Sequence, residues 1–299
     1  MFKKKLNKWL YEKTRNLLRM QAKVKPYTIE VEGHSIAYLE SNNPEGKNTL
    51  ILIHGLNDEK ESWLMLAAAL KGKYHLIIID LLGCGESDLD MDFEYTLHNQ
   101  ADFLEKIIQK LMEEKNIDSF SFAGHSMGGL VVLLADRLPI DKFILVDALG
   151  IHVKMTSMQE KYQKIKNVDE LPFLNTHNKE QLKEMMKMAM YKPLYMPNFM
   201  LEHIIAKKAE VVAFERKKFY TVVDENMVHR EDLEAEIKNI KQETLIVWGK
   251  EDLSLDVASA HKMHKLIENS TLKVYEECRH YPQVEKPKEL ARDIIAFLK

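Results

Sequence analysis

The sequence lacks several features that would mark particular classes of protein. It has two cysteines, Cys84 and Cys278, far apart and without C-x-x-C spacing, so neither a disulfide framework nor a thiolate metal site is indicated. A net charge of −3 provides no basic field for nucleic acid. No apolar run reaches the ~18 residues of a membrane span. These absences favour a globular protein of a reducing compartment, the cytoplasm.

The first 25 residues combine an excess of positive charge with an apolar stripe. Their single acid is Glu12, whereas Lys and Arg recur throughout the segment. At helical spacing most apolar side chains gather on one face: Phe2, Leu6, Trp9, Leu10, Leu17 and Met20. The unbroken apolar region and cleavage site of a secretory signal are missing, so we expect the segment to be retained. Two interpretations stay open: a helix lying peripherally on the inner membrane face, or a solvated helix docked on the domain.

Short apolar runs alternate with helical patterns along most of the chain. The runs predict eight strands, at 27–32, 35–40, 49–53, 75–79, 119–123, 143–146, 244–248 and 272–275. Helical patterns lie at 61–71, 99–114, 127–138, 257–267 and 287–298. Buried strands that alternate with helices predict an α/β fold, with a mostly parallel, doubly wound sheet that begins with an antiparallel hairpin.

The alternation stops after Gly150 and resumes at 244, and the intervening chain is helix-like and rich in Met and Lys. We therefore predict a basic N-terminal segment at 1–25, a core at 26–150 and 240–299, and a helical cap at 151–239. A late insertion in such a sheet lies over the carboxyl ends of the strands, where ligands bind. Met190 and Met196 are pocket candidates, because flexible Met side chains suit varied acyl chains, although Met is also ordinary core packing.

Ser126 is the strongest candidate for chemistry. It lies in Gly-His-Ser-Met-Gly-Gly, after an apolar strand and before a helical pattern, as a G-x-S-x-G nucleophile elbow requires. Gly124 and Gly128 remove side chains where strand and helix approach each other. We expect the Ser126 hydroxyl to be a nucleophile.

A serine nucleophile needs a base, and the base needs an acid. His280 lies between the last predicted strand and the terminal helix, where a loop can bring an imidazole to the strand ends. Asp252 follows the strand at 244–248, which gives the chain order Ser, Asp, His. Three other acids stay open as alternatives to Asp252: Glu251, Asp256 and Asp147. His261 and His264 could share a metal, but no third ligand is in view, so we expect neither a metal site nor a cofactor.

Two backbone amides are candidates for an oxyanion hole: that of Met127, directly after the nucleophile, and that of Leu56, in the loop after the strand at 49–53. Asn57 and His125 flank these positions and are further pocket candidates. Asp80 also ends a strand, but we expect it to hold the loop of Gly83 and Gly85 through hydrogen bonds to the backbone.

These blocks together resemble the α/β-hydrolase superfamily from Thr49 to Lys299. The matching motifs are His-Gly-x-x at 54, Asp-x-x-Gly-x-Gly-x-Ser at 80, Gly-His-Ser-Met-Gly-Gly at 124, Gly-x-x-Asp at 249 and Cys-x-His-x-Pro-Gln at 278. Leu82 replaces a common Pro, and Arg279 replaces a frequent Gly, where it could narrow the approach to His280. The stretches 54–63 and 190–197 look like bacterial cold-type lipases and membrane-associated monoacylglycerol lipases.

The resemblance implies an enzyme that hydrolyses carboxylic esters through a Ser126–His280–Asp252 triad, acting on a small ester or lipid such as a monoacylglycerol. Carbon–carbon bond hydrolysis and thioester hydrolysis use the same triad and stay open. So does a catalytically silent hydrolase fold that serves as a binding protein, because fold alone does not fix function. The sequence does not set acyl length or oligomeric state.

Overall fold

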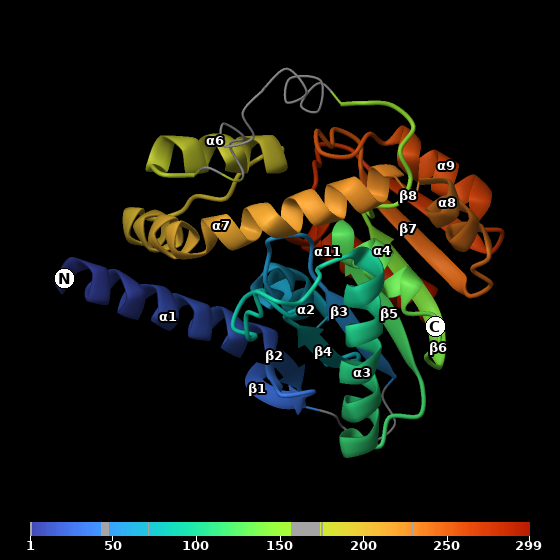
Figure 1. The fold of residues 1–299 in the computed structure, drawn as a ribbon, viewed down its shortest axis with the longest axis horizontal. Helices are drawn as coiled ribbons and strands as arrows, with labels where there is room; N and C mark the ends of the chain where they lie inside the picture. Colours follow the sequence, from blue (N-terminus) through green and yellow to red (C-terminus); the bar gives the residue numbers. More distant parts are fainter. Residues whose placement is uncertain (1, 43–47, 71, 157–173, 175, 229) are drawn as a thin grey trace.

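The computed structural model describes residues 2–42, 48–70, 72–156, 174, 176–228 and 230–299. Its centre is an eight-stranded sheet in the order β1-β2-β4-β3-β5-β6-β7-β8. The strands are β1 (Val24–Val31), β2 (His34–Ser41), β3 (Thr49–Ile53), β4 (His75–Ile79), β5 (Phe120–His125), β6 (Ile140–Val146), β7 (Glu243–Gly249) and β8 (Ser270–Tyr275). The predicted α/β class and number of strands are confirmed (Figure 1).

Strand direction changes only at the amino-terminal edge of the sheet. β1 and β2 form the predicted antiparallel hairpin, and β2 is also antiparallel to β4. All pairs from β4 through β3, β5, β6 and β7 to β8 are parallel. The carboxyl ends of the parallel strands therefore share one edge, at which loops from several strands can meet.

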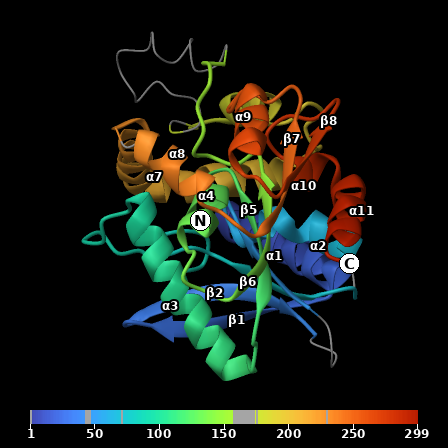
Figure 2. The same ribbon diagram turned by 90° about the vertical axis from the view of Figure 1, so that its right-hand side faces the viewer.

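Helices cover both faces of the sheet. One face carries α2 (Leu64–Leu70) and α11 (Pro287–Phe297), and the other carries α3 (Leu97–Lys115), α4 (Met127–Leu134) and α9 (Ala258–Leu266), as Figure 2 shows. Side chains of β3 divide between the layers, because Ile51 and Ile53 join one buried cluster and Leu50 and Leu52 join the other. A strand buried on both faces reads as a continuous apolar run, which is why the sequence located β3 and β4 to the residue.

Several helix ends differ from the sequence prediction, and the structure gives contacts at two of these places. The helix predicted at 127–138 ends at Leu134, and the chain then turns toward Arg137, whose amide donates to Glu105 Oε1 over 3.1 Å. The terminal helix is preceded by a separate short helix, α10 (Pro282–Glu285), because Pro287 cannot donate the hydrogen bond that would continue it.

Between β6 and β7 the chain forms α6 (Lys179–Ala189), α7 (Asn198–Val228) and α8 (Arg230–Lys238). Figure 1 shows α6 above α7, with α7 crossing the molecule. A small apolar cluster of Leu182, Met186 and Leu201 joins α6 to α7, and Met196 packs against it. Met158 and the rest of 157–173 lie outside the described residues. The division into core and cap stays a prediction.

The N-terminal segment forms helix α1 (Phe2–Ala22), which lies along α7 and α2 (Figure 1). The side turned to the body is polar: Asn7 donates to Glu202 over 2.7 Å, Tyr11 to Glu59 over 3.1 Å, and the Arg19 Nη2 atom to Glu86 over 2.9 Å. No helix in the part of the chain that the structure describes is long and apolar enough to cross a bilayer.

A buried ion cluster joins α1 to the core. Lys60, in the 3-10 turn η1 (Lys60–Trp63), is fully buried; its Nζ atom contacts Asp80 and lies 2.8 Å from Glu86. Its amide donates to Asp80 Oδ1 over 2.7 Å. Asp80 also accepts from the Glu86 amide over 2.8 Å, so it holds the Gly83 and Gly85 loop as predicted.

Replacing Lys60 by Met should destabilise the fold strongly, because it leaves the buried Asp80 carboxylate without its cation. Removing one partner of a buried pair typically costs about 3–5 kcal/mol, which urea unfolding would measure as a lower midpoint. Lys106→Met is the matched control, since Lys106 pairs with Glu32 at the surface, where such pairs contribute about 0–1 kcal/mol. Equal losses in the two variants would show that the Lys60 pair has no special role.

Candidate active site

Ser126 lies at the sharp turn between β5 and α4. Its backbone has φ 52° and ψ −122°, a conformation rare for residues other than Gly. The turn is held by the Ser126 amide, which donates to Val146 over 3.0 Å, and by the Ser126 carbonyl, which accepts from Leu149 over 2.8 Å. A Cβ atom on Gly128 would collide with the His54 carbonyl oxygen, so only Gly fits there. The turn keeps the serine at the carboxyl edge of the sheet.

The structure brings Ser126, His280 and Asp252 together from three separate segments. The His280 Nε2 atom lies 3.0 Å from Ser126 Oγ, and its Nδ1 atom lies 2.7 Å from Asp252 Oδ2. His280 is in the loop between β8 and α10, and Asp252 follows β7. A Cβ atom on Gly249 would overlap the Arg279 carbonyl, so this glycine lets the two loops approach closely. The geometry is that of a hydroxyl, a base and an orienting acid.

The three alternative acids have other contacts. Glu251 accepts from the Cys278 amide over 3.1 Å, and Asp256 accepts from the Ala258 amide over 2.9 Å at the start of α9. Asp147, at the end of β6, is fully buried and accepts from the Gly249 amide over 3.0 Å. Of the four acids, Asp252 is the one hydrogen-bonded to His280.

The proposed oxyanion amides come from both sides of the serine. Met127 begins α4, and Leu56 lies in the loop after β3. Gly55 brings that loop against the elbow: a Cβ atom there would be 3.1 Å from Ser126 Cβ. Asn57 has a positive φ of 54° and donates to the Glu215 carbonyl on α7 over 3.3 Å. The loop is therefore fixed between the elbow and the inserted helices.

His125 is buried directly beside the triad. Its Nε2 atom lies 2.6 Å from the His280 carbonyl oxygen and must donate to it, which fixes the tautomer. Burial, and secondarily the neighbouring His280, lower the pKa of His125 well below its usual range, so the ring is neutral. Through this bond the elbow strand holds the loop that carries His280.

The inserted helices reach the site through backbone and side chains. The Ala189 carbonyl, next to the half-buried Met190, accepts from the His280 amide over 3.0 Å. Arg279 donates to the Lys187 carbonyl at the end of α6 and lies 6.0 Å from the Tyr191 ring. The Arg279 side chain is thus engaged with α6.

One ligand atom each from Asp147, Asp252 and His280 lie within 4.8 Å of one another, a spacing that also occurs in metal sites. Both ring nitrogens of His280, however, already have protein partners. The donor set is that of a hydrogen-bonded relay. His261 and His264 lie exposed on α9, and His264 Nδ1 is 2.7 Å from the Ser270 hydroxyl.

Sequence reasoning missed two groups that support the site. Lys60, in the turn that follows the loop of Leu56, joins Asp80 and Glu86. Lys218, on α7, is almost fully buried and donates to the Gly83 carbonyl over 2.9 Å. Neither was foreseeable from the sequence, because each looks like one more surface lysine in a charged segment. Only the structure shows that Asp80 is buried and therefore needs a cation.

The comparisons with known proteins identify the family of the chain. Residues 48–287 match the family described as alpha/beta hydrolase fold. The chain is 31% identical over 291 residues to Lipase 3 of Moraxella sp. (strain TA144), covering 96% of this chain and 87% of that protein. It is 27% identical over 298 residues to Monoacylglycerol lipase ABHD6 of Bos taurus, covering 97% and 85%.

Solved structures extend the likeness to the whole fold. The crystal structure of a membrane phospholipase A, described as a novel bacterial virulence factor, has a TM-score of 0.87 at 26% identity. The match covers 98% of this chain and 91% of that one, so it includes α1 and the inserted helices. The chain belongs to the α/β-hydrolase fold family, as a hydrolase related to lipases and esterases.

Proposed function

We propose that the protein hydrolyses carboxylic esters of lipids, with a monoacylglycerol or another medium-chain ester as substrate. The observation that carries this proposal is the continuous relay from Ser126 Oγ through His280 to Asp252, with distances of 3.0 and 2.7 Å. The relatives named lipases favour esters over thioesters and carbon–carbon bonds as the substrate bond.

The proposed reaction uses these groups in turn. Ser126 Oγ attacks the ester carbonyl while His280 Nε2 takes its proton, and His280 then gives that proton to the leaving alcohol. The Leu56 and Met127 amides stabilise the oxyanion. A water molecule then gives a proton to His280 Nε2 and attacks the acyl carbon, and His280 returns the proton to Ser126 Oγ as the carboxylic acid leaves. Asp252 keeps the proton-accepting nitrogen of His280 toward the serine.

The inserted helices would supply the acyl-binding surface, as a cap at 151–239. Met190 and Met196 are the proposed apolar lining, with Asn57 and His125 at the polar end. In support, Met190 follows the residue whose carbonyl binds His280, and Met196 packs on the apolar cluster between α6 and α7. Unbranched thioether side chains can adapt to chains of different length.

A fluorophosphonate probe should label Ser126 in the folded protein, because the relay activates this hydroxyl. Ser126→Ala should abolish labelling and lower kcat on p-nitrophenyl esters by at least about 10⁴-fold. Ser119→Ala is the matched control and should keep full labelling, since Ser119 directly precedes β5, at the end away from Ser126, and bonds Asp141. Absence of an adduct on the folded wild-type protein would favour the silent binding fold.

Substrate class would be set by a series of monoacylglycerols and p-nitrophenyl esters of increasing chain length. We expect kcat/KM to rise from acetyl to medium-chain esters, because each CH₂ buried against the cap contributes up to about 0.8 kcal/mol. The corresponding thioesters and a dienone acid serve as comparison. A series with no dependence on chain length would contradict the acyl-binding role of the cap.

The protein also has a surface suited to a lipid layer, and we propose that it docks there through α1. The apolar side of this helix faces away from the body: Leu6, Trp9, Leu17 and Met20 are 42%, 56%, 54% and 73% exposed. Its polar side makes the contacts with the core described above. A helix docked on its own domain through a hydrophobic face would show the reverse arrangement.

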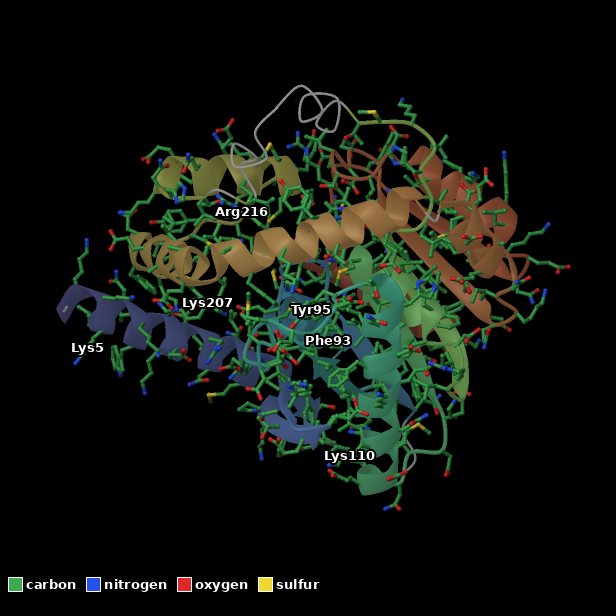
Figure 3. The ribbon with its side chains drawn as sticks, in the orientation of Figure 1. Lys5, Phe93, Tyr95, Lys110, Lys207 and Arg216 are labelled. Carbon is green, nitrogen blue, oxygen red and sulfur yellow. The ribbon has the colours of Figure 1, made fainter. Side chains whose placement is uncertain are left out.

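Charge and shape support the same docking face. Exposed lysines, Lys5, Lys8 and Lys13, flank the apolar side chains, and in Figure 3 Lys5 lies at the free end of α1. Beside α1 is a mainly apolar groove of about 920 Å³, to which Leu18, Met65, Leu194 and Ile295 contribute. Aromatic and aliphatic side chains combined with cations bind anionic lipid surfaces.

Flotation with vesicles of phosphatidylglycerol and phosphatidylcholine tests the docking. Trp9→Ser with Leu17→Ser should weaken partition about tenfold or more, since burial of each side chain contributes on the order of 1–2 kcal/mol. The control is Leu89→Ser with Met91→Ser, which removes similarly exposed apolar groups elsewhere. Equal flotation of the two double variants, or no flotation of the wild type, would reject the proposal without affecting the esterase assay.

A further inference from the structure

Beside the relay lies a second buried carboxyl group, Asp147, for which ester hydrolysis by Ser126, His280 and Asp252 assigns no role. Asp147 directly follows β6 and is 0% exposed. Its backbone has a φ of 43°, and its amide donates to Val247 of β7 over 3.0 Å. Like Ser126, it is a residue other than Gly with a positive φ at the end of a parallel strand, and such backbone strain concentrates at functional positions.

One carboxylate oxygen of Asp147 lies within 4.8 Å of a carboxylate oxygen of Asp252, and both lie within 4.8 Å of a ring nitrogen of His280. Two ionised carboxylates cannot share a dry site, because the repulsion between them and the loss of hydration both disfavour the charged forms. One of the pair must hold a proton.

Hydrogen-bond partners decide which one holds it. Asp252 accepts two bonds, from His280 Nδ1 over 2.7 Å and from the Ser254 amide over 2.7 Å, and both stabilise an anion. Asp147 accepts one, from the Gly249 amide, while its Oδ2 atom is buried and finds no donor among the described residues. A proton on this oxygen gives it a partner, because it can then donate to Asp252.

We propose that Asp147 is a positioning residue whose protonated carboxyl donates a hydrogen bond to Asp252, keeping Asp252 ionised and aimed at His280. The inference rests on the proposed function, since it assigns Asp252 as the acid of the relay. The other titratable groups nearby are His280 and Cys278, in the loop before α10, and Glu285 in α10. Burial, and then the charge of Asp252, raise the pKa of the Asp147 carboxyl well above its usual range.

Two substitutions distinguish a protonated, hydrogen-bonding Asp147 from an Asp147 with a purely structural role. In Asp147→Asn the amide oxygen can still accept from Gly249 and the amide nitrogen can donate to Asp252, so kcat should stay within about threefold of wild type. Asp147→Ala removes both bonds, and kcat should fall about 10- to 100-fold with KM nearly unchanged. A purely structural role would instead lower the thermal stability of Asp147→Ala while leaving kcat per folded molecule intact.

The pH profile of kcat/KM supplies a readout that packing does not move, because its acid limb reports the catalytic base. The acid limb of Asp147→Asn should coincide with that of wild type. The acid limb of Asp147→Ala should move to higher pH, since the negative charge of Asp252 is then no longer shared with a hydrogen bond from residue 147. If Asp147 were ionised, Asp147→Asn would remove a negative charge near the base and move the limb to lower pH. That result would overturn the proposal.

Infrared difference spectroscopy tests the proton without any assay of activity. The wild type minus Asp147→Asn spectrum should contain the carbonyl band of one buried, protonated carboxylic acid at neutral pH. A carboxylate band in its place, or stoichiometric Zn²⁺ bound by the wild type and lost in Asp147→Asn, would overturn the proposal. If the band is present and the enzyme hydrolyses no ester, the proposed function fails while the shared proton stands.

Discussion

The strained turn at Ser126 is the constraint on which the rest of the site depends. A strand that enters a helix through φ 52° and ψ −122° needs neighbours that hold it, and the structure supplies them on both sides: Val146 of β6 with Leu149 of the loop after it, and the glycines that admit the His54 loop. Each neighbour has a second function. The β6 loop also carries Asp147, and the His54 loop carries Leu56. Holding the turn therefore also places the groups around it.

Most of the fold was predictable because its signals are local. Strands buried on both faces, such as β3 and β4, appear as uninterrupted Ile and Leu runs, and their ends were predicted to the residue. The less buried ends of strands were not predicted to the residue. β6 begins at Ile140 rather than at the predicted 143, because Asp141 and Lys142 are exposed or half-buried and their sequence looks like a loop. The early end of α4 depends on Glu105 of α3, a contact between segments that no local pattern encodes.

The site was predictable to the level of motifs, but not of contacts. Ser126, Asp252 and His280 each follow a recognisable strand, and the structure places His280 within hydrogen-bonding distance of both Ser126 and Asp252. The pairing of Asp147 with Asp252 requires the register of β6 against β7, where Val146 lies opposite Val247. The sequence could only offer the two acids as alternatives, because which of them reaches His280 depends on the loops after those strands.

Helix α1 shows how the same pattern can have opposite structural meanings. An apolar stripe on a helix normally packs against the core, yet here the core side is polar and the stripe is outside. The reason lies in its partners: Arg15 and Arg19 reach Glu86, which also binds Lys60, and Lys207 of α7 approaches from the other side, toward Glu59 and α1 (Figure 3). Separating α1 from the core would leave these partly buried charges without their partners. The polar face is thereby committed to the protein, and the apolar face stays exposed at the surface.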